Sequence, residues 1–174
     1  MLLLHNFDNK ITAAIRSLPD TYKPLMTVLT IAGEPLVVVS LGVLGLLSAS
    51  QHKQPAIEHA FAYGIIAFGL NTILKLLLHR TRPHGLIIRT LGLRSYSFPS
   101  GHAFGTVIFY GLFAYLDIKY LAHPWNTLIA ICLALTVFLI GVSRVYLGAH
   151  YPSDVVAGWF LGVVSLAIIN SLAF

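Results

Sequence analysis

Long apolar stretches separated by short polar segments occupy most of the chain. A helix needs about 20 apolar residues to cross the roughly 30 Å hydrocarbon core of a bilayer. Five stretches are candidates, covering residues 25–47, 60–78, 103–116, 127–142 and 155–174. The ten-residue alternation that is typical of membrane-spanning strands does not occur in the sequence. The pattern therefore predicts an all-α fold, a polytopic membrane helix bundle of about five transmembrane helices.

Residues 1–23 follow a different pattern. Phe7, Ile11 and Ile15 recur at helical spacing, whereas Asp8 and Lys10 lie mostly off that stripe. Such a pattern is typical of an amphipathic helix that lies in the membrane interface, with a frayed terminus as the alternative. Together with a bundle over 25–174, it makes residues 1–174 a single integral-membrane domain.

Two local features predict how the helices pack and bend. Gly101 and Gly105, like Gly158 and Gly162, have the Gly-x-x-x-Gly spacing that allows close helix packing. Glu34 directly precedes a proline inside the first apolar stretch, which predicts a local bend there. An intramembrane carboxyl is a functional candidate by default. Beside a proline, however, a protonated or hydrogen-bonded Glu34 is an equally good interpretation, and we do not assign it to catalysis.

Composition supports an integral membrane protein. Of the 174 residues, 57% are hydrophobic and only 10% are charged, whereas a soluble domain carries about 25% charged residues. The mean hydropathy is +0.81, which excludes a disordered chain and nearly any soluble domain. The single cysteine, Cys132, rules out an intramolecular disulfide. The net charge of +5 favours anionic lipid headgroups or an anionic ligand, and no basic stripe for nucleic acid is visible.

The first of three polar clusters covers residues 75–83, at the end of the second apolar stretch. On a continuous helix Lys75 and Arg82 would share one face, with His79 between them. Snorkelling to the membrane boundary explains Arg80 well. It explains Lys75 poorly, because Lys75 lies well inside the apolar run.

The second cluster, Pro99 to His102, precedes the third apolar stretch. Ser100 is a good N-cap, and Gly101 lets an anion approach the backbone closely. A helix N-terminus presents free N–H groups and partial positive charge, which suits phosphate. His102 then lies in the first turn.

The third cluster covers residues 143–154, between the fourth and fifth apolar stretches. Pro152 favours a helix start, so His150 is expected just before the helix and Asp154 in its first turn. In that arrangement a carboxylate can hold one imidazole nitrogen and leave the other free. Arg144 lies at the end of the preceding helix.

Successive spans reverse direction, so all three clusters are expected on one membrane face. The three cations Lys75, Arg82 and Arg144 would form a clamp for phosphate. Phosphoryl transfer needs mainly correct positioning of the groups and stabilisation of negative charge. One imidazole can act as a nucleophile and a second can protonate the leaving oxygen. The clusters contain neither a carboxylate group for two metals nor a cysteine. This inventory fits a metal-free histidine phosphatase.

The motifs resemble those of the type 2 phosphatidic acid phosphatase family, whose site is similar to that of the vanadium-dependent haloperoxidases. The family pattern is Lys, six residues, Arg-Pro; then Pro-Ser-Gly-His; then Ser-Arg, five residues, His, three residues, Asp. The chain matches every fixed position over about residues 60–174: Lys75, Arg82, Pro83, Pro99, Ser100, Gly101, His102, Ser143, Arg144, His150 and Asp154.

The resemblance implies a membrane lipid phosphatase that needs no metal or cofactor. His150 would become phosphohistidine, Asp154 would orient it, and His102 would be the general acid. The phosphate-binding residues would be Lys75, Arg82, Arg144, Ser100 and Gly101. Candidate substrates are phosphatidylglycerol phosphate, phosphatidic acid, undecaprenyl diphosphate and lipid A phosphates. Four basic residues fall outside the pattern and are expected mainly in a solvated loop over 84–98: His79, His84, Arg89 and Arg94.

The alternative function is a non-catalytic transporter or binding protein for anions or lipid phosphates, because intramembrane polar residues also line such paths.

Family members generally place the site on the outer face of the membrane, here expected to be a bacterial cytoplasmic membrane. The positive-inside rule suggests the reverse, since nine Lys and Arg lie on the motif side against Lys53 and Lys119 on the other. Three of the nine are assigned to phosphate, and our expectation follows the family. The glycine-rich helix faces could pack within one chain or between chains, so the sequence does not predict the oligomeric state.

Overall fold

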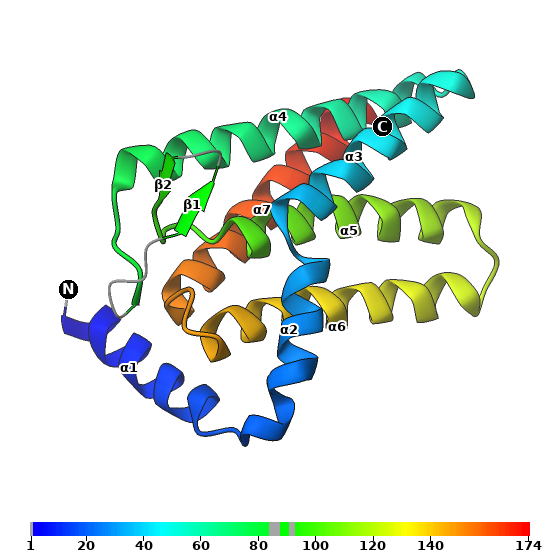
Figure 1. Cartoon of the computed structure of the whole chain (residues 1–174). Helices are drawn as coiled ribbons and strands as arrows, with labels where there is room; N and C mark the ends of the chain where they lie inside the picture. Colours follow the sequence, from blue (N-terminus) through cyan, green and yellow to red (C-terminus); the bar gives the residue numbers. More distant parts are fainter. Residues whose placement is uncertain (1, 84–87, 91–92) are drawn as a thin grey trace.

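The computed structural model describes residues 2–83, 88–90 and 93–174, and helices dominate this part of the chain (Figure 1). The all-α prediction is confirmed. In chain order the elements are α1 (Leu2–Arg16), the 3₁₀ turn η1 (Asp20–Tyr22), α2 (Lys23–Ala32), α3 (Pro35–Gln51), α4 (Pro55–Leu78), β1 (Ile88–Thr90), β2 (Leu93–Ser95), α5 (Gly101–Tyr120), α6 (Trp125–Tyr146) and α7 (Pro152–Ala173).

The predicted number of membrane spans is confirmed in a modified form. Helices α4, α5, α6 and α7 are each long and apolar enough to cross a bilayer. The segment Asp20–Ala32 and helix α3 together form a fifth candidate, a broken span bent by 40°. The helices extend beyond the predicted stretches at most ends, because hydropathy marks their apolar middles and not the capping residues.

The bend in the first span lies where the sequence predicts it. Helix α2 ends at Ala32, and α3 begins at Pro35 with Glu34 as its N-cap residue. A proline in the first turn costs the helix nothing, because the first N–H groups have no partner within the helix. Inside a continuous helix the same ring would clash with the preceding turn.

Helix α4 ends earlier than the first polar cluster predicts. His79 adopts a left-handed conformation with φ of 50°, so the helix stops at Leu78. Arg82 therefore does not lie on the helix, and the prediction that Lys75 and Arg82 share one helix face is wrong. Part of the expected loop over 84–98 is a small antiparallel sheet in which Ile88 lies opposite Ser95. Strands of three residues are too short for periodicity to reveal them.

The amphipathic N-terminal helix is confirmed for part of its predicted length. Helix α1 ends at Arg16, shortly before Pro19, whose neighbourhood disfavours helical backbone. Its apolar residues Phe7, Ile11 and Ile15 line a small apolar cavity against α6 and α7. Asp8, which we expected off the packed face, is only 3% exposed.

Helix α5 is the most buried of the spanning helices, and α7 packs closely against it through glycines. A Cβ atom on Gly158 would lie 2.7 Å from the backbone oxygen of Ser100, and one on Gly162 would lie 2.8 Å from Cβ of Val107. The prediction that these glycines serve close packing is confirmed. The packing places the first turns of α5 and α7 side by side.

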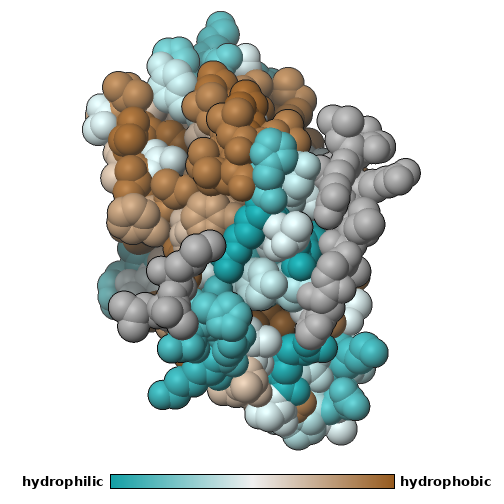
Figure 2. All heavy atoms as spheres, turned by 90° about the vertical axis from the view of Figure 1, so that its left-hand side faces the viewer, coloured by the Kyte–Doolittle hydropathy of each residue, from teal (hydrophilic) through white to brown (hydrophobic). Residues whose placement is uncertain are grey.

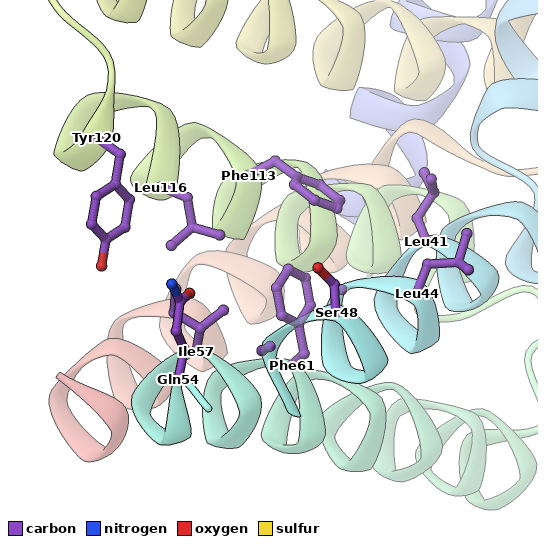
Figure 3. A pocket seen from close by; sticks show the side chains of 11 residues that line it. Leu41, Leu44, Ser48, Gln54, Ile57, Phe61, Phe113, Leu116 and Tyr120 are labelled. Atoms are coloured by element: carbon purple, nitrogen blue, oxygen red, sulfur yellow. The ribbon is translucent and has the colours of Figure 1, made fainter. Parts of the chain in front are cut away.

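A cavity of about 430 Å³ lies between α3, α4 and α5 (Figure 3). Its lining runs from Leu41 and Leu44 on α3 to Gln54 and Tyr120, at the start of α4 and the end of α5. None of its lining residues is a carboxylate, an imidazole or a cation. It lies toward the opposite end of the helices from the polar clusters, so it is not the candidate active site.

Candidate active site

The end of α4 and the starts of α5 and α7 meet the end of α6 at one end of the bundle (Figure 1). The backbone N–H of Ser100 donates to the carbonyl of Asp154 at 3.0 Å, which joins the starts of α5 and α7. Arg82 Nη1 donates to the carbonyl of Ala149 at 2.8 Å. The three polar clusters therefore meet, as the topology predicts. Figure 2 shows this end, where hydrophilic residues gather in the middle and lower parts and an apolar area lies above them.

The centre of the site is a buried pair formed by His150 and Asp154. His150 lies in the turn before α7 and Asp154 in its first turn, as the sequence predicts. They are 2% and 0% exposed, and His150 Nδ1 lies 3.5 Å from Asp154 Oδ2. The backbone N–H of Tyr151 donates to the same oxygen at 2.8 Å. The start of α7 therefore fixes the carboxylate beside the imidazole.

The contacts of His150 define which nitrogen carries the proton. Arg82 Nη1 lies 3.2 Å from His150 Nε2. A guanidinium can only donate hydrogen bonds, so Nε2 must be the acceptor. The proton of the neutral ring is then on Nδ1, which faces Asp154. His150 thus presents a lone pair on Nε2 toward the cations of the site.

Electrostatics keep this imidazole neutral. Burial lowers the pKa of His150 well below its ordinary value, and the charges of Lys75, Arg82 and Arg144 lower it further. The charges of all three cations act on this one ring, and Arg82 contacts it directly. At neutral pH the ring is therefore uncharged, which is the form a nucleophile needs.

Arg82 is fixed by the strand that precedes the second motif. Its Nε donates to the carbonyl of Ser95 at 3.1 Å, and its Nη2 lies 3.2 Å from Ser95 Oγ. The side chain is buried. A guanidinium held on several sides keeps its plane, which suits bidentate contact with phosphate.

The start of α5 has the capped first turn that the sequence predicts. Ser100 caps the helix, its Oγ accepting from the backbone N–H of Ala103 at 3.4 Å. A Cβ atom on Gly101 would lie 3.4 Å from Lys75 Nζ, so the lysine ammonium lies beside the first turn of the helix. Asn71 precedes Lys75 by one turn and is buried, and neither of its side-chain amide atoms has a hydrogen-bond partner in the described structure. Asn71 falls outside the three motifs, so no pattern in the sequence marks it as a site residue.

His102 on α5 and Arg144 on α6 both lie next to residues of the bent first span. His102 Nε2 is buried without a hydrogen-bond partner among the described residues, and Glu34 Oε2 lies 3.9 Å from it. Arg144 Nη1 donates to Thr30 Oγ1. The structure therefore places Glu34, which we did not assign to catalysis, next to a predicted site residue.

Two residues that the motifs do not include hold the Asp154 carboxylate. Ser97 is fully buried, donates to Asp154 Oδ2, and lies 3.4 Å from His150 Nδ1. Arg80 Nη1 donates to Asp154 Oδ1 at 2.6 Å, and its Nη2 donates to Asp8 Oδ2 at 2.8 Å. The interpretation of Arg80 as a snorkelling cation is wrong, because its charge is paired inside the protein.

Other residues named from the sequence lie elsewhere. His79 is exposed and its ring meets the edge of Tyr96, with ring centres 4.6 Å apart, so it does not lie between Lys75 and Arg82. His84 and the side chains of Arg89 and Arg94 lie outside the described residues. Among the residues that the structure describes, no three His, Cys, Asp or Glu side chains are grouped so that they could hold a metal ion.

Comparison with known proteins gives a consistent result. The model of the PAP2 superfamily matches residues 56–174. The chain is 32% identical over 112 residues to phosphatidylglycerophosphatase B of Bacillus subtilis, covering 61% of this chain and 54% of that protein. It is 32% identical over 147 residues to an undecaprenyl-diphosphatase of Sulfolobus acidocaldarius, covering 82% of this chain and 66% of the relative. The chain thus spans less than two thirds of the length of both curated relatives.

Solved structures show the same fold. A transmembrane PAP2-type phosphatidylglycerolphosphate phosphatase from Bacillus subtilis superposes with a TM-score of 0.82 at 26% identity, covering 99% of this chain and 87% of that one. LpxE of Aquifex aeolicus superposes with a TM-score of 0.67 at 22% identity, covering 93% of each chain. The second likeness concerns the fold alone.

Proposed function

Because the chain belongs to the PAP2 superfamily, as its three motifs predict, we propose that it is a lipid phosphatase that uses His150 as its nucleophile. The observation that carries the proposal is the buried His150, with its Nδ1 facing Asp154 and its Nε2 facing Arg82. A neutral imidazole fixed in this tautomer, in contact with Arg82 and under the charges of Lys75 and Arg144, is arranged to attack a bound phosphate.

In the first step, Lys75, Arg82, Arg144 and the N–H groups at Gly101 bind the phosphate oxygens. The lone pair of His150 Nε2 attacks phosphorus, and the bond from phosphorus to the leaving oxygen breaks. His102, which takes up a proton once the bound phosphate anion offsets the neighbouring cations, gives that proton to the leaving oxygen. Asp154 stabilises the positive charge that develops on the imidazole, because it faces the Nδ1 proton.

In the second step, water attacks phosphorus and His102 takes a proton from that water. The bond between phosphorus and Nε2 breaks, which releases inorganic phosphate and restores neutral His150. His102 is protonated again at the end of the cycle. No residue outside the three clusters has to supply or remove a proton.

The proposed substrate is a membrane lipid with a terminal phosphate, either a monoester or a diphosphate end. The two relatives are a phosphatidylglycerophosphatase and an undecaprenyl-diphosphatase, and a further relative at 28% identity is a lipid A 1-phosphatase of Rhizobium etli. The site lies at the ends of membrane-spanning helices, where the phosphate of an amphiphile would lie. We place the protein in a bacterial cytoplasmic membrane with the site on its outer face.

The test is phosphate release by the purified protein in detergent with excess chelator. The substrates are phosphatidylglycerol phosphate, phosphatidic acid, undecaprenyl diphosphate and lipid A. We expect chelator-resistant release that is lost in His150→Ala and reduced in His102→Ala. The exposed His52→Ala, at the opposite end of the bundle, is the control and should retain activity. Release from none of these lipids by folded protein would instead favour a transporter or binding protein.

A further inference from the structure

We propose that Asp8 of the N-terminal helix is a positioning residue for the His150–Asp154 pair and acts through Arg80. The inference rests on the proposed phosphatase function and adds α1, which lies outside the matched family region 56–174, to the catalytic apparatus. The juxtaposition of Asp8, Arg80 and the first turn of α7 supports it.

Asp8 binds the first turn of α7 across a long sequence separation. The backbone N–H of Ser153 donates to Asp8 Oδ1 at 2.8 Å, and Ser153 Oγ donates to Asp8 Oδ2 at 2.7 Å. The N–H groups of a first helical turn have no partners within their own helix. A carboxylate from α1 therefore satisfies one of them and lies at the positive end of α7, where a negative charge is favourable.

Arg80 lies between two carboxylates. Its Nη2 bonds to Asp8 and its Nη1 to Asp154, at 2.8 and 2.6 Å, and the guanidinium also stacks 4.4 Å from the centre of the Tyr151 ring. The Arg80 side chain is 27% exposed, whereas those of Asp8 and Asp154 are 4% and 0% exposed. Without Asp8, only the Asp154 side of the guanidinium would keep an ionic partner.

The orientation of Asp154 depends on this arrangement. Arg80 holds Oδ1, while Ser97 and the N–H of Tyr151 hold Oδ2, the oxygen that faces His150 Nδ1. If Arg80 moves, one side of the carboxylate loses its donor and the plane of the carboxylate is no longer fixed. The imidazole then loses a defined partner for its Nδ1 proton. A small displacement of this kind lowers the rate of chemistry more than it lowers substrate affinity.

The packing of α1 explains why an N-terminal residue can have this role. Phe7, Ile11 and Ile15 lie against α6 and α7, so the helix is held beside the start of α7. Asp8 follows Phe7 and is buried. A buried carboxylate is tolerated because a cation and two further donors surround it.

The test is a double-mutant cycle with dioctanoyl phosphatidic acid as the substrate. We expect Asp8→Asn to lower kcat about ten- to hundredfold with KM changed less than about twofold. In an Arg80→Ala background the same substitution should lower kcat less than it does in the parent, because the path through Arg80 is already lost and only the Ser153 contacts of Asp8 remain. The control is Asp20→Asn. Asp20 is exposed and is the other acidic residue among residues 1–23, so its replacement should leave kcat unchanged.

A stability control separates positioning from folding. Ile11→Ala weakens the packing of α1 and leaves the charged groups unchanged. Even if its Tm falls as much as the Tm of Asp8→Asn, the kcat of the folded Ile11→Ala protein should equal that of the parent. Three outcomes would overturn this inference without touching the proposed function. They are equal losses of kcat in Ile11→Ala and Asp8→Asn, independent (multiplicative) effects of the Asp8 and Arg80 substitutions on kcat, and an unchanged kcat in Asp8→Asn. Absence of phosphate release by the parent protein from every one of the four candidate lipids would overturn the proposed function, and this inference with it.

Discussion

At the scale of single residues, the Asp154 carboxylate determines the geometry of the site. It is fully buried, and donors from three separate segments reach it: Arg80 after α4, Ser97 before α5, and the backbone of Tyr151. A buried charge is stable only when such partners surround it. The carboxylate therefore cannot turn away from His150 without losing a charge-assisted hydrogen bond.

Replacing Ser97 tests this view of the carboxylate. Ser97→Ala removes the hydroxyl that donates to Asp154 Oδ2. A hydrogen bond to a charged group contributes about 1.5–3 kcal/mol, so we expect kcat to fall roughly ten- to hundredfold with little change in KM. Steady-state kinetics of the purified variant provide the measurement. The control is Ser171→Ala, an exposed serine that bonds within α7 and should behave like the parent.

The pH dependence of activity follows from the lowered pKa of His150. Protonation of His150 at Nε2 would remove the attacking lone pair. Activity is therefore lost as the pH falls through the pKa that His150 has in the folded protein. Burial and the surrounding cations lower that pKa below its ordinary value of about 6.5. The acid limb of kcat/KM should therefore have its midpoint below pH 6.5, after correction for the separately measured ionisation of the substrate phosphate. A midpoint above that value would contradict a neutral, buried nucleophile.

The sequence predicts the motif residues of the site but not their supports. His150 and Asp154 lie within one helix start, so their relation follows from local rules about proline and the first turn. Ser97 contacts Asp154 across 57 positions and Asp8 contacts Ser153 across 145 positions. Such distant pairs depend on how elements pack, and no local periodicity encodes them.

At the scale of elements, the site depends on helix ends that are held together by close packing. Gly158 lies against the backbone of Ser100, and Gly162 lies against Val107. These contacts bring the start of α7, with Asp154, to the start of α5, with His102. The apolar pattern predicts the spans well because a bilayer imposes length and hydropathy on them. It also marks the end of α4 at Leu78, whereas the continuation of this helix to Arg82, taken from the polar cluster, is wrong because His79 is left-handed.

Adding a methyl group at this contact should separate the two helix starts. In Gly158→Ala the new Cβ would lie 2.7 Å from the Ser100 backbone oxygen, which cannot move aside easily. We expect a loss of about 1–3 kcal/mol in stability, seen as a lower Tm in detergent, together with reduced kcat. Gly69→Ala on α4 is the matched control, because a Cβ there meets nothing within 4 Å. An equal loss in both variants would show that close packing is not the cause.

At the scale of the whole molecule, the helix directions place all the proposed catalytic residues at one end of the bundle (Figure 1). The opposite end has the apolar cavity between α3, α4 and α5 (Figure 3). Lys and Arg are concentrated at the site end, but Arg80 and Arg82 bond to protein groups there. Their placement therefore reflects the site as well as the topology, which weakens the positive-inside argument for a cytoplasmic site.

Cysteine labelling tests the proposed outer-face orientation. In a Cys132→Ser background, Lys10→Cys introduces a thiol on exposed α1 near the site, and His123→Cys introduces one at the opposite end. A membrane-impermeant maleimide added to intact cells should label the first variant and not the second. Labelling only of the second variant would reverse the orientation and place the site on the cytoplasmic face.

Transfer of radiolabelled phosphate from a lipid substrate to His150 would test directly whether His150 is the nucleophile. The protein is mixed rapidly with the substrate, quenched in alkali, and digested to locate the label, because phosphohistidine survives alkali and not acid. We expect label on the peptide that contains His150, and none in His150→Ala. Label at another residue, or undiminished lipid hydrolysis by His150→Ala, would contradict the assignment of the nucleophile.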